Sequence, residues 1–600
     1  MPKYAFEQYI AVRRYQPTLA FSPDGSEIAY ITNTSGQYNL WKQPSAGGYA
    51  VQLTLFADQA VRDISWSPDG TTIAFSADRD GNEFKQIYTL PARGGLPELL
   101  TPAEGVRHEL SADAWSPDGT SLAYGGNDRS ESDVDILIRN QATGESRRVV
   151  DYGGYYIPVA WSPDGESMTL VDFRSNTDMD VYTLSVKDEE MVLQTAHEGE
   201  AVFIPGSWAP DSSGFYLITS EGREYSGLAF QKTDGTRSWV ETPDADIENV
   251  ELSRDGRYLV WQVNEQGYAR LHGRDLSTGE MLDLPTIPDG TINSMAISPT
   301  GARIGLLLTQ PRQSTEVVVI DIETRAVTTL TWSFLGGIEP TDLVAPQLIT
   351  FPTHDGRDIA AWLYRPEGDG PFPVVLSIHG GPEAQERPNY SPLYQYLLSR
   401  GIGVMAPNVR GSTGYGKTFQ TLIHHDWGGA ELLDFKAAAE YLKALDWVDG
   451  NRLGVYGGSF GGFATLSCVT RLPEYWAAAV DIVGPSNLVT FAKAVPPTWR
   501  RFMDKWVGNP ETEVDFLMER SPITYVDQVR APLFVIQGAN DPRVVKGESD
   551  QIVERLQERG VEVRYDVYED EGHGFTRRAN EIKAMGDAAQ WFIDHLGATA

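Results

Sequence analysis

Ser459 lies in the sequence Gly457-Gly458-Ser459-Phe460-Gly461, a pattern typical of a serine nucleophile. Residues 452–456 before it are predicted to form a buried strand, and residues 463–469 after it a helix. The flanking glycines permit a tight strand-to-helix turn, which would present the hydroxyl at a sheet edge and at the positive end of a helix dipole. The pattern is common, so its meaning depends on which residues the chain places downstream of it.

A serine hydroxyl needs a base to take its proton, and the base needs a partner that fixes its tautomer. Asp541 follows the apolar run 533–536, and His573 follows the apolar run 561–567. Both residues are therefore expected on loops at strand ends. The order Ser, Asp, His is that of α/β-hydrolases. We predict Ser459 as nucleophile, His573 as general base and acid, and Asp541 as the residue that orients it.

A site for the developing oxyanion is also indicated. The sequence His379-Gly380-Gly381-Pro382 directly follows residues 374–378, which have a strand pattern. Two glycines free backbone N–H groups to face a substrate oxygen, as the corresponding loop of esterases does. The N–H of Phe460, next to the nucleophile, is the second expected donor.

Composition narrows the class of protein. Six hundred residues exceed what one hydrophobic core usually serves, so at least two domains are expected. The net charge of −34 argues against nucleic acid as a partner. No leader and no apolar run long enough for a bilayer are found, which predicts no membrane partner. The single cysteine, Cys468, excludes an internal disulfide and is consistent with the cytoplasmic location that we predict.

The N-terminal half contains an internal repeat. Trp66-Ser67-Pro68-Asp69-Gly70 has close copies that begin at Phe21, Trp115 and Trp161, and degraded copies at Trp208, Leu252 and Ile297. Successive copies are 44 to 49 residues apart. Such a period, with several short strands in each unit, is the signature of a β-propeller. Seven copies predict seven blades, with the aromatic residue before most turns buried between blades.

After the repeats the pattern changes to strands that alternate with helices, which predicts a doubly wound, mostly parallel sheet. The expected fold is thus a seven-bladed β-propeller followed by an α/β-hydrolase domain. We place the propeller at residues 16–335, a linker at about 332–346, and the catalytic domain at 345–600. Residues 1–15 are expected to hold a helix that packs on the hydrolase domain.

This arrangement resembles the prolyl oligopeptidase family of serine peptidases over essentially the whole chain. The resemblance is closest to the acylaminoacyl-peptidase branch and rests on four motifs: His379–Pro382, Asn408–Gly416, Gly457–Gly462 and Gly538–Val544. Prolyl oligopeptidases proper use a tyrosine side chain in the oxyanion hole, whereas the sequence here implies the backbone N–H of Gly381. The resemblance therefore implies a peptidase without strict proline specificity.

The resemblance also implies substrate contacts. Arg543, two residues after Asp541, matches the family arginine that binds a substrate carbonyl near the scissile bond. The pocket for the residue before that bond, P1, is expected to be lined from the segment after strand 478–483. Its apolar candidates are Phe491, Trp499 and Phe502.

The implied activity is hydrolysis of short peptides after apolar residues through an acyl-enzyme, without a metal or organic cofactor. An acylaminoacyl-peptidase-like exopeptidase or oligopeptidase is favoured. A dipeptidyl peptidase or aminopeptidase would need a carboxylate for the free amine, for which Glu83, Glu221 and Glu224 are candidates. A carboxypeptidase would need an arginine for the terminal carboxylate. A carboxylesterase and an inert propeller that binds a partner stay as alternatives, and the sequence leaves open whether the chain forms a homo-oligomer.

Overall fold

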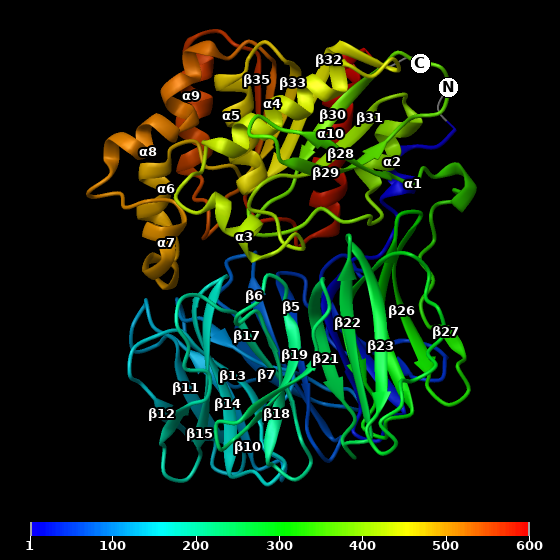
Figure 1. Ribbon diagram of the computed structural model, residues 1–600, viewed down its shortest axis with the longest axis vertical. Coiled ribbons are helices and arrows are strands. Elements are labelled where there is room, and N and C mark those ends of the chain that lie inside the picture. The colour runs from blue at the N-terminus through cyan, green and yellow to red at the C-terminus, as the bar shows by residue number, and fades with distance from the viewer. Residues whose placement is uncertain (1–2, 598–600) are drawn as a thin grey trace.

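The computed structural model describes residues 3–597, which form two domains stacked on each other (Figure 1). The chain first builds the propeller and then the hydrolase domain, which covers one end of the propeller. The last propeller strand ends at Thr329 and the first hydrolase strand begins at Gln347. Residues 1–2 of the predicted N-terminal segment and residues 598–600 of the predicted catalytic domain lie outside the described residues.

The propeller has seven blades among the described residues, as the repeat predicts. Blade 6 has three strands and the other blades have four, each strand antiparallel to its neighbour. The strands are β1 Tyr15–Phe21, β2 Glu27–Thr32, β3 Asn39–Pro44, β4 Val51–Gln52; β5 Gln59–Trp66, β6 Thr72–Arg79, β7 Gln86–Pro91, β8 Glu98–Leu99; β9 His108–Glu109, β10 Ser121–Gly126, β11 Asp135–Asn140, β12 Ser146–Val150; β13 Tyr156–Trp161, β14 Ser167–Ser175, β15 Asp178–Ser185, β16 Met191–Leu193; β17 Phe203–Trp208, β18 Gly214–Thr219, β19 Gly227–Lys232, β20 Arg237–Glu241; β21 Asp246–Leu252, β22 Tyr258–Glu265, β23 Tyr268–Asp275; and β24 Thr291–Ile297, β25 Arg303–Gln310, β26 Gln313–Asp321, β27 Val327–Thr329.

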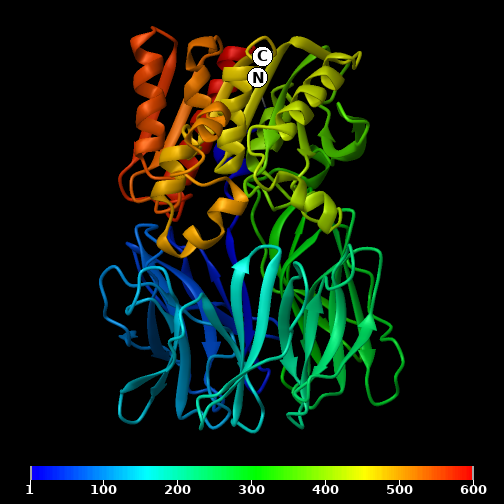
Figure 2. The same cartoon turned by 60° about the vertical axis from the view of Figure 1, so that its left-hand side comes forward.

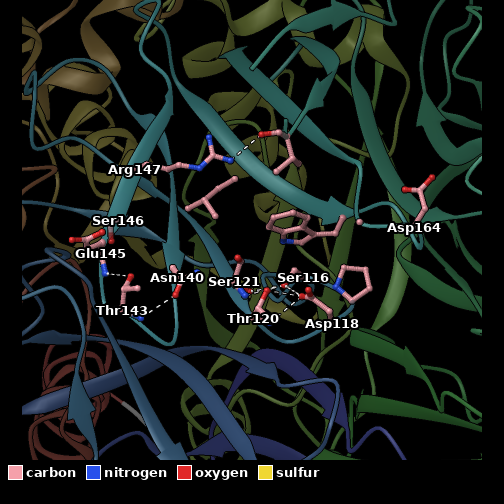
Figure 3. Close-up of a pocket in the computed structure, with 15 residues that line it drawn as sticks. Ser116, Asp118, Thr120, Ser121, Asn140, Thr143, Glu145, Ser146, Arg147 and Asp164 are labelled. Atoms are coloured by element: carbon pink, nitrogen blue, oxygen red, sulfur yellow. Dashed lines mark hydrogen bonds between the residues drawn. The ribbon is translucent and has the colours of Figure 1, made fainter. Parts of the chain in front are cut away.

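The repeated Ser-Pro-Asp-Gly sequence is a self-bonded turn, shown for blade 3 in Figure 3. The Ser116 hydroxyl donates to Asp118 Oδ1 at 2.7 Å and accepts from the Ser121 N–H at 2.9 Å. The Thr120 N–H also donates to Asp118 Oδ1, at 3.0 Å. Hydrogen bonds from Ser116 and Thr120 lower the pKa of the Asp118 carboxyl. The turn between successive strands is therefore stabilised by hydrogen bonds among residues of the turn and the first residue of the next strand.

The tryptophan before the turn joins neighbouring blades. The indole Nε1 of Trp115 donates to Ser65 O at 3.2 Å, and that of Trp161 donates to Ala114 O at 3.0 Å. The Trp208 indole repeats the contact with Ala160 O at 3.3 Å. Each of these three side chains is at most 9 % exposed. The predicted burial between blades is confirmed in these copies, and a donated hydrogen bond accompanies it.

The hydrolase domain contains an eight-stranded sheet in the order β28-β29-β31-β30-β32-β33-β34-β35. The pairs β28·β29 and β29·β31 are antiparallel, and the other neighbours are parallel. The strands are β28 Gln347–Pro352, β29 Asp358–Tyr364, β30 Phe372–Ile378, β31 Gly403–Asn408, β32 Val448–Gly458, β33 Trp476–Ile482, β34 Leu533–Gly538 and β35 Val563–Tyr568. The parallel strands carry their carboxyl ends to one edge, where an α/β domain has its site.

Helices cover both faces of this sheet (Figure 1). Side chains of α4, α5 and α9 share one apolar core with the sheet, and those of α1, α2 and α10 share the other. The helices are α1 Phe6–Tyr9, α2 Pro392–Ser399, α3 Lys417–Gln420, α4 Ala430–Lys443, α5 Phe460–Arg471, α6 Leu488–Ala494, α7 Arg500–Trp506, α8 Val514–Arg520, α9 Gly547–Glu558 and α10 Arg578–Leu596, with 3₁₀ turns η1 Pro340–Asp342, η2 Thr421–Ile423, η3 Pro497–Trp499 and η4 Pro522–Gln528.

The segment before the first blade returns to the hydrolase domain. Helix α1 packs against α2 and α10, and the ring of Phe6 meets that of Tyr396 edge-on with centroids 5.2 Å apart. Across residues 3–597, none of the helices combines the length and the apolar character that a membrane span requires.

Candidate active site

Ser459 occupies the turn between β32 and α5. Its backbone has φ 59° and ψ −121°, a left-handed conformation that is uncommon for any residue other than glycine. The Ser459 N–H donates to Ile482 O at 2.9 Å, on the neighbouring strand β33. Strain at one residue, held by the surrounding sheet and helix, is a feature of functional sites. The turn that the sequence predicts is therefore present, with Ser459 as its strained residue.

Gly461 shows why this turn needs its glycines. A Cβ atom on Gly461 would lie 2.2 Å from Ile378 O and 3.0 Å from His379 O, at the end of β30. Any side chain here would push the first turn of α5 away from residues His379–Pro382, which we call the oxyanion loop. A Cβ on Gly380 would lie 3.1 Å from the carbonyl oxygen of Gly458, the residue before Ser459, which is closer than most side chains tolerate. The absent side chains thus bring the oxyanion loop against the serine.

The structure brings the three predicted triad residues together. Ser459 Oγ lies 2.9 Å from His573 Nε2, and His573 Nδ1 lies 2.7 Å from Asp541 Oδ2. Because an ionised carboxylate only accepts, Nδ1 carries the proton and Nε2 accepts from the serine hydroxyl. This is the geometry of a nucleophile, a base and an orienting carboxylate.

Asp541 is fixed by its own loop. Its Oδ1 accepts hydrogen bonds from the N–H groups of Arg543 at 2.8 Å and Val544 at 3.0 Å, which leaves Oδ2 for His573. The Asp541 side chain is fully buried and that of His573 is 10 % exposed. The imidazole therefore has one orientation in which both of its nitrogens are engaged.

A cavity of about 250 Å³ opens beside Ser459. Gly381 and Phe460, the predicted oxyanion donors, lie on its wall with His573. Burial lowers the pKa of His379, at the start of the oxyanion loop, which favours its neutral form, and its Nδ1 lies 2.8 Å from Gly380 O. The loop thus brings no charge of its own to the place where a negative oxygen would form.

The predicted apolar candidates Phe491, Trp499 and Phe502 all line this cavity. Trp427 and Trp506, which the sequence analysis missed, complete the aromatic wall. Trp506 follows Trp499 and Phe502 at helical spacing, and that spacing could have revealed it. The cavity suits a large apolar side chain.

Two further lining residues come from the propeller. Phe173 and Asn176 belong to the β14–β15 hairpin of blade 4 and reach the cavity across the domain interface. No motif marks them, since their role depends only on how the two domains meet. The sequence analysis missed both.

Arg543 lies at the rim of the same cavity. Its guanidinium is 5.6 Å from the ring centre of Trp499, and its Nε is 2.7 Å from Glu83 Oε1 of the propeller. Glu83 also lies 3.7 Å from Arg107 Nη1 and has φ 60°, a left-handed backbone. The arginine therefore faces the serine cavity on one side and a propeller carboxylate on the other.

Beyond Arg543 and His573 is a second cavity of about 330 Å³ between the two domains. Its wall carries charges of both signs, with one more positive than negative: four cations, Arg62, Lys85, Arg107 and Arg543, and three carboxylates, Asp63, Asp78 and Glu83. The other candidate carboxylates are not in either cavity. Glu221 pairs with Arg237, and Glu224 accepts from the Thr418 N–H at 2.9 Å.

Asp481 lies behind the turn, fully buried in β33. A Cβ atom on either Gly462 or Gly484 would lie 2.4 Å from Asp481 Oδ1, so two glycines make the space for this carboxyl. Burial, only partly offset by the Gly484 N–H, raises the pKa of Asp481 to about 7. The sequence analysis gave this residue no role.

Cavity size alone would have misplaced the site. A larger cavity, about 810 Å³, lies between blades 3 and 4, far along the chain from Ser459 (Figure 3). Residues of its wall bond to one another, as in the Ser116–Asp118 turn and in the bond that Arg147 Nη2 donates to Val186 O at 2.9 Å. Among residues 3–597, no group of three or more His, Cys, Asp or Glu side chains is arranged to hold a metal ion.

Residues 388–599 match the family model described as prolyl oligopeptidase family. The hydrolase domain thus matches the prolyl oligopeptidase family of serine peptidases. The chain is accordingly a serine peptidase. A second family model, the WD domain G-beta repeat, matches residues 51–82 in blades 1 and 2 of this peptidase.

Known relatives span much of the peptidase. Dipeptidyl aminopeptidase BIII of Pseudoxanthomonas mexicana is 29 % identical, over 95 % of this chain and 85 % of its own length. The acylamino-acid-releasing enzyme of Arabidopsis thaliana is 27 % identical, over 37 % of this chain and 30 % of its own length. A puromycin-hydrolysing peptidase of Mycobacterium tuberculosis has the same fold, with a TM-score of 0.85, 21 % identity, and coverage of 100 % of this chain and 97 % of that one.

Proposed function

We propose that this peptidase removes dipeptides from the free N-terminus of short peptides whose P1 residue is large and apolar. Ser459 is the nucleophile, His573 the general base and acid, and Asp541 the residue that orients the imidazole. The observation that supports the chemistry is the unbroken chain of contacts at 2.9 Å and 2.7 Å beside the aromatic cavity.

The mechanism is built on these positions. His573 Nε2 takes the serine proton while Ser459 Oγ attacks the scissile carbonyl, and the oxyanion accepts from the N–H groups of Gly381 and Phe460. His573 then protonates the leaving amine, and an acyl-enzyme remains on Ser459. Water, activated by His573, hydrolyses the ester by the same steps. Each oxyanion donor contributes about 3–4 kcal/mol to the stability of the transition state.

The preference for P1 derives from the cavity wall. Phe491 is 3 % exposed and packed in the adjoining core, so it forms the floor of the pocket. A branched or aromatic side chain would remove more apolar surface from water here than a small one would. The aromatic residues of the hydrolase domain that surround this space of about 250 Å³ are Trp427, Phe460, Phe491, Trp499, Phe502 and Trp506.

The position of Glu83 supports dipeptide release. We assign Arg543 to the carbonyl oxygen of P2, the residue that precedes P1. Within one residue the amine nitrogen and the carbonyl oxygen are only a few ångströms apart. A carboxylate 2.7 Å from the Arg543 guanidinium is therefore within reach of the amine of that same residue. A free amine at P2 would pair with Glu83, and the product would be a dipeptide.

The blade 2 turn fixes Glu83 close to the catalytic histidine. A Cβ atom on Gly81 would lie 2.5 Å from the nitrogen of Gly572, the residue before His573. Such close backbone contact leaves the turn little freedom, and the left-handed backbone of Glu83 directs its side chain toward Arg543. One relative that matches nearly the whole chain is named a dipeptidyl aminopeptidase, in accord with this proposal.

Release of an acylated amino acid is the second candidate. Glu83 already has two guanidinium neighbours, Arg543 and Arg107, which reduce its attraction for an ammonium group. The residues that line the serine cavity include no carboxylate. A blocked N-terminus, which carries no charge, would suit this environment and would need no anchor.

The deciding measurement is kcat/KM for a matched set of peptides with the same apolar P1 residue. The set contains a free dipeptidyl substrate, its N-acetylated form, an acetylated single residue, and a form with one more residue at the N-terminus. We expect the free dipeptidyl substrate to be cleaved fastest. Faster cleavage of the acetylated single residue would contradict dipeptide release and support the second candidate.

A matched pair of variants tests the anchor. Glu83→Gln should raise KM for the free substrate about tenfold or more, since a hydrogen bond between the substrate amine and a charged carboxylate is worth about 1.5–3 kcal/mol. It should leave the acetylated substrate nearly unchanged. Glu221→Gln, which alters a propeller carboxylate outside both cavities, is the control. Equal losses for both substrates would rule out Glu83 as an amine anchor.

A further inference from the structure

The blade 4 hairpin is the one part of the propeller that lines the serine cavity in the described chain. We define it as residues 173–178, the end of β14, the turn and the start of β15. Phe173 and Asn176 contribute to the cavity wall, and the remaining lining residues belong to the hydrolase domain. Figure 2 shows the orange segment with α6 and α7 extending from the hydrolase domain onto the propeller.

Phe173 forms part of the aromatic wall. Its ring meets that of Phe502 edge-on, with centroids 6.0 Å apart and an interplanar angle of 84°. On the propeller side it packs in the same manner against Tyr155, at 5.9 Å. Phe173 is thus held by its own blade while it presents an apolar edge to the cavity. Its ring limits the size of a side chain that the cavity can accept.

Asn176 reaches the oxyanion loop through one intermediate. Its Nδ2 donates to Glu383 Oε2 at 2.8 Å, and Glu383 lies two residues after Gly381. The other oxygen, Oε1, accepts from Gln420 Nε2 at 3.0 Å and lies 3.0 Å from His424 Nε2. Burial would raise the pKa of Glu383, but the bonds from His424, Asn176 and Gln420 outweigh it and lower that pKa. An ionised Glu383 is therefore fixed between the two domains.

The same hairpin also contacts the helix that carries the pocket aromatics. Lys505 on α7 donates to Thr177 Oγ1 at 3.2 Å and pairs with Glu200 of the propeller. Lys505 is one residue before Trp506 and three after Phe502, both of which line the cavity. The hairpin thus contacts both the pocket wall and the segment that comes after the oxyanion loop.

We propose that the blade 4 hairpin determines specificity and positions the oxyanion loop: Phe173 closes the P1 pocket, and Asn176 holds the loop through Glu383. This inference rests on the proposed function, in which the cavity beside Ser459 receives the P1 side chain. Asn176 and Glu383 are positioning residues, since they act through Gly381. The P1 pocket and the oxyanion hole are then complete only when the propeller is docked.

The first test changes the pocket wall. Phe173→Ala should shift the ratio of kcat/KM between a P1 tryptophan and a P1 alanine substrate about tenfold or more toward tryptophan. The ring would no longer limit the size of the P1 side chain, and a difference of one methylene in an apolar pocket is already worth about 1–3 kcal/mol. Tyr268→Ala is the matched control. Tyr268 is on a blade 6 hairpin and meets Trp362 of the hydrolase domain at 5.4 Å, outside the cavity. A ratio that moves equally in both variants, or in neither, would overturn the assignment of Phe173.

The second test separates positioning from binding. Asn176→Ala and Glu383→Gln should each lower kcat about tenfold or more with little change in KM, because a displaced oxyanion donor acts mainly in the transition state. The double variant should be no slower than the slower single variant, since both changes break one connection. Additive losses, or losses in KM alone, would overturn the positioning role.

Asn264→Ala is the control for domain docking. Asn264 of blade 6 donates to Gln385 Oε1 at 2.7 Å, farther along the same segment and outside the cavity. We expect its kcat to stay within about twofold of the parent. A loss as large as that of Asn176→Ala would mean that docking in general, and not this hairpin, sets the rate.

Ser459→Ala distinguishes the two proposals. If this variant is inactive and Phe173→Ala leaves P1 selectivity unchanged, only the hairpin inference fails. If Ser459→Ala keeps its activity, the cavity is not the active site and both proposals fall together. An inactive Ser459→Ala with altered selectivity in Phe173→Ala supports both.

Discussion

The two domains contribute to the same site in opposite ways. The hydrolase domain supplies Ser459, Asp541 and His573 from three loops at one edge of one sheet, within 2.9 Å of each neighbour. The propeller supplies only the tips of hairpins, Glu83 from blade 2 and Phe173 and Asn176 from blade 4. The groups proposed to break bonds are therefore fixed within one fold, whereas the substrate contacts proposed for the propeller depend on how the two folds meet.

The comparison predicts the largest losses of kcat for substitutions of the triad residues at the sheet edge. Ser459→Ala should lower kcat about 10⁵–10⁶-fold while the fold is kept, since triad removal in serine peptidases has costs of this size. The loss of kcat is measured as turnover of an aminoacyl anilide. Labelling by a fluorophosphonate reports whether a reactive serine is present. The parent should be labelled and the variant should not. Substantial turnover by the variant would remove Ser459 from the chemistry.

Asp541→Asn should have the next largest effect, a loss of about 10⁴-fold in kcat. The amide oxygen can still accept from the N–H groups of Arg543 and Val544, which turns the NH₂ group toward His573 Nδ1. The imidazole would then carry its proton on Nε2, where it cannot accept from Ser459. Single-turnover rates at several pH values would reveal the change, and a loss below about tenfold would contradict the orienting role.

The same contrast explains what the sequence could predict. Ser459, Asp541 and His573 each follow a strand of one sheet, so local patterns and chain order were sufficient to place them. The seven blades were predictable because each repeat encodes its own turn. Phe173, Asn176 and the choice of Glu83 over Glu221 and Glu224 were not, since they depend on which hairpins face the hydrolase domain. The sequence pattern of a single segment does not indicate how the two domains are oriented relative to each other.

Asp481→Asn should change how stability depends on pH. The pKa of Asp481 is raised from 3.8 to about 7 in the folded protein, so between these values the folded state binds more protons than the unfolded state. Stability therefore falls as pH rises through this window. At about 1.4 kcal/mol for each pH unit, the difference amounts to about 4 kcal/mol.

An asparagine cannot ionise and should lose this part of the pH dependence. Unfolding midpoints between pH 4 and pH 8 should decline less in Asp481→Asn than in the parent. The exposed Asp446 gives a control variant, Asp446→Asn, whose curve should run parallel to that of the parent. Parallel curves for Asp481→Asn as well would mean that this carboxyl is not held in its protonated form.

Single substitutions in the propeller should have the smallest effect, because each blade packs against two neighbours and one lost contact is a small part of that packing. Trp161→Phe removes the indole bond to Ala114 O, which keeps its bond from the Ala123 N–H at 2.8 Å. The loss of this one hydrogen bond should lower the free energy of unfolding by about 1 kcal/mol beyond the loss of packing. Trp66→Phe is a matched change, since within the described residues the buried Trp66 Nε1 has no hydrogen-bond partner. Urea unfolding followed by far-UV circular dichroism compares the two. If Trp66→Phe costs as much as Trp161→Phe, the indole bonds between blades contribute nothing beyond packing, and the propeller is held together by apolar contact alone.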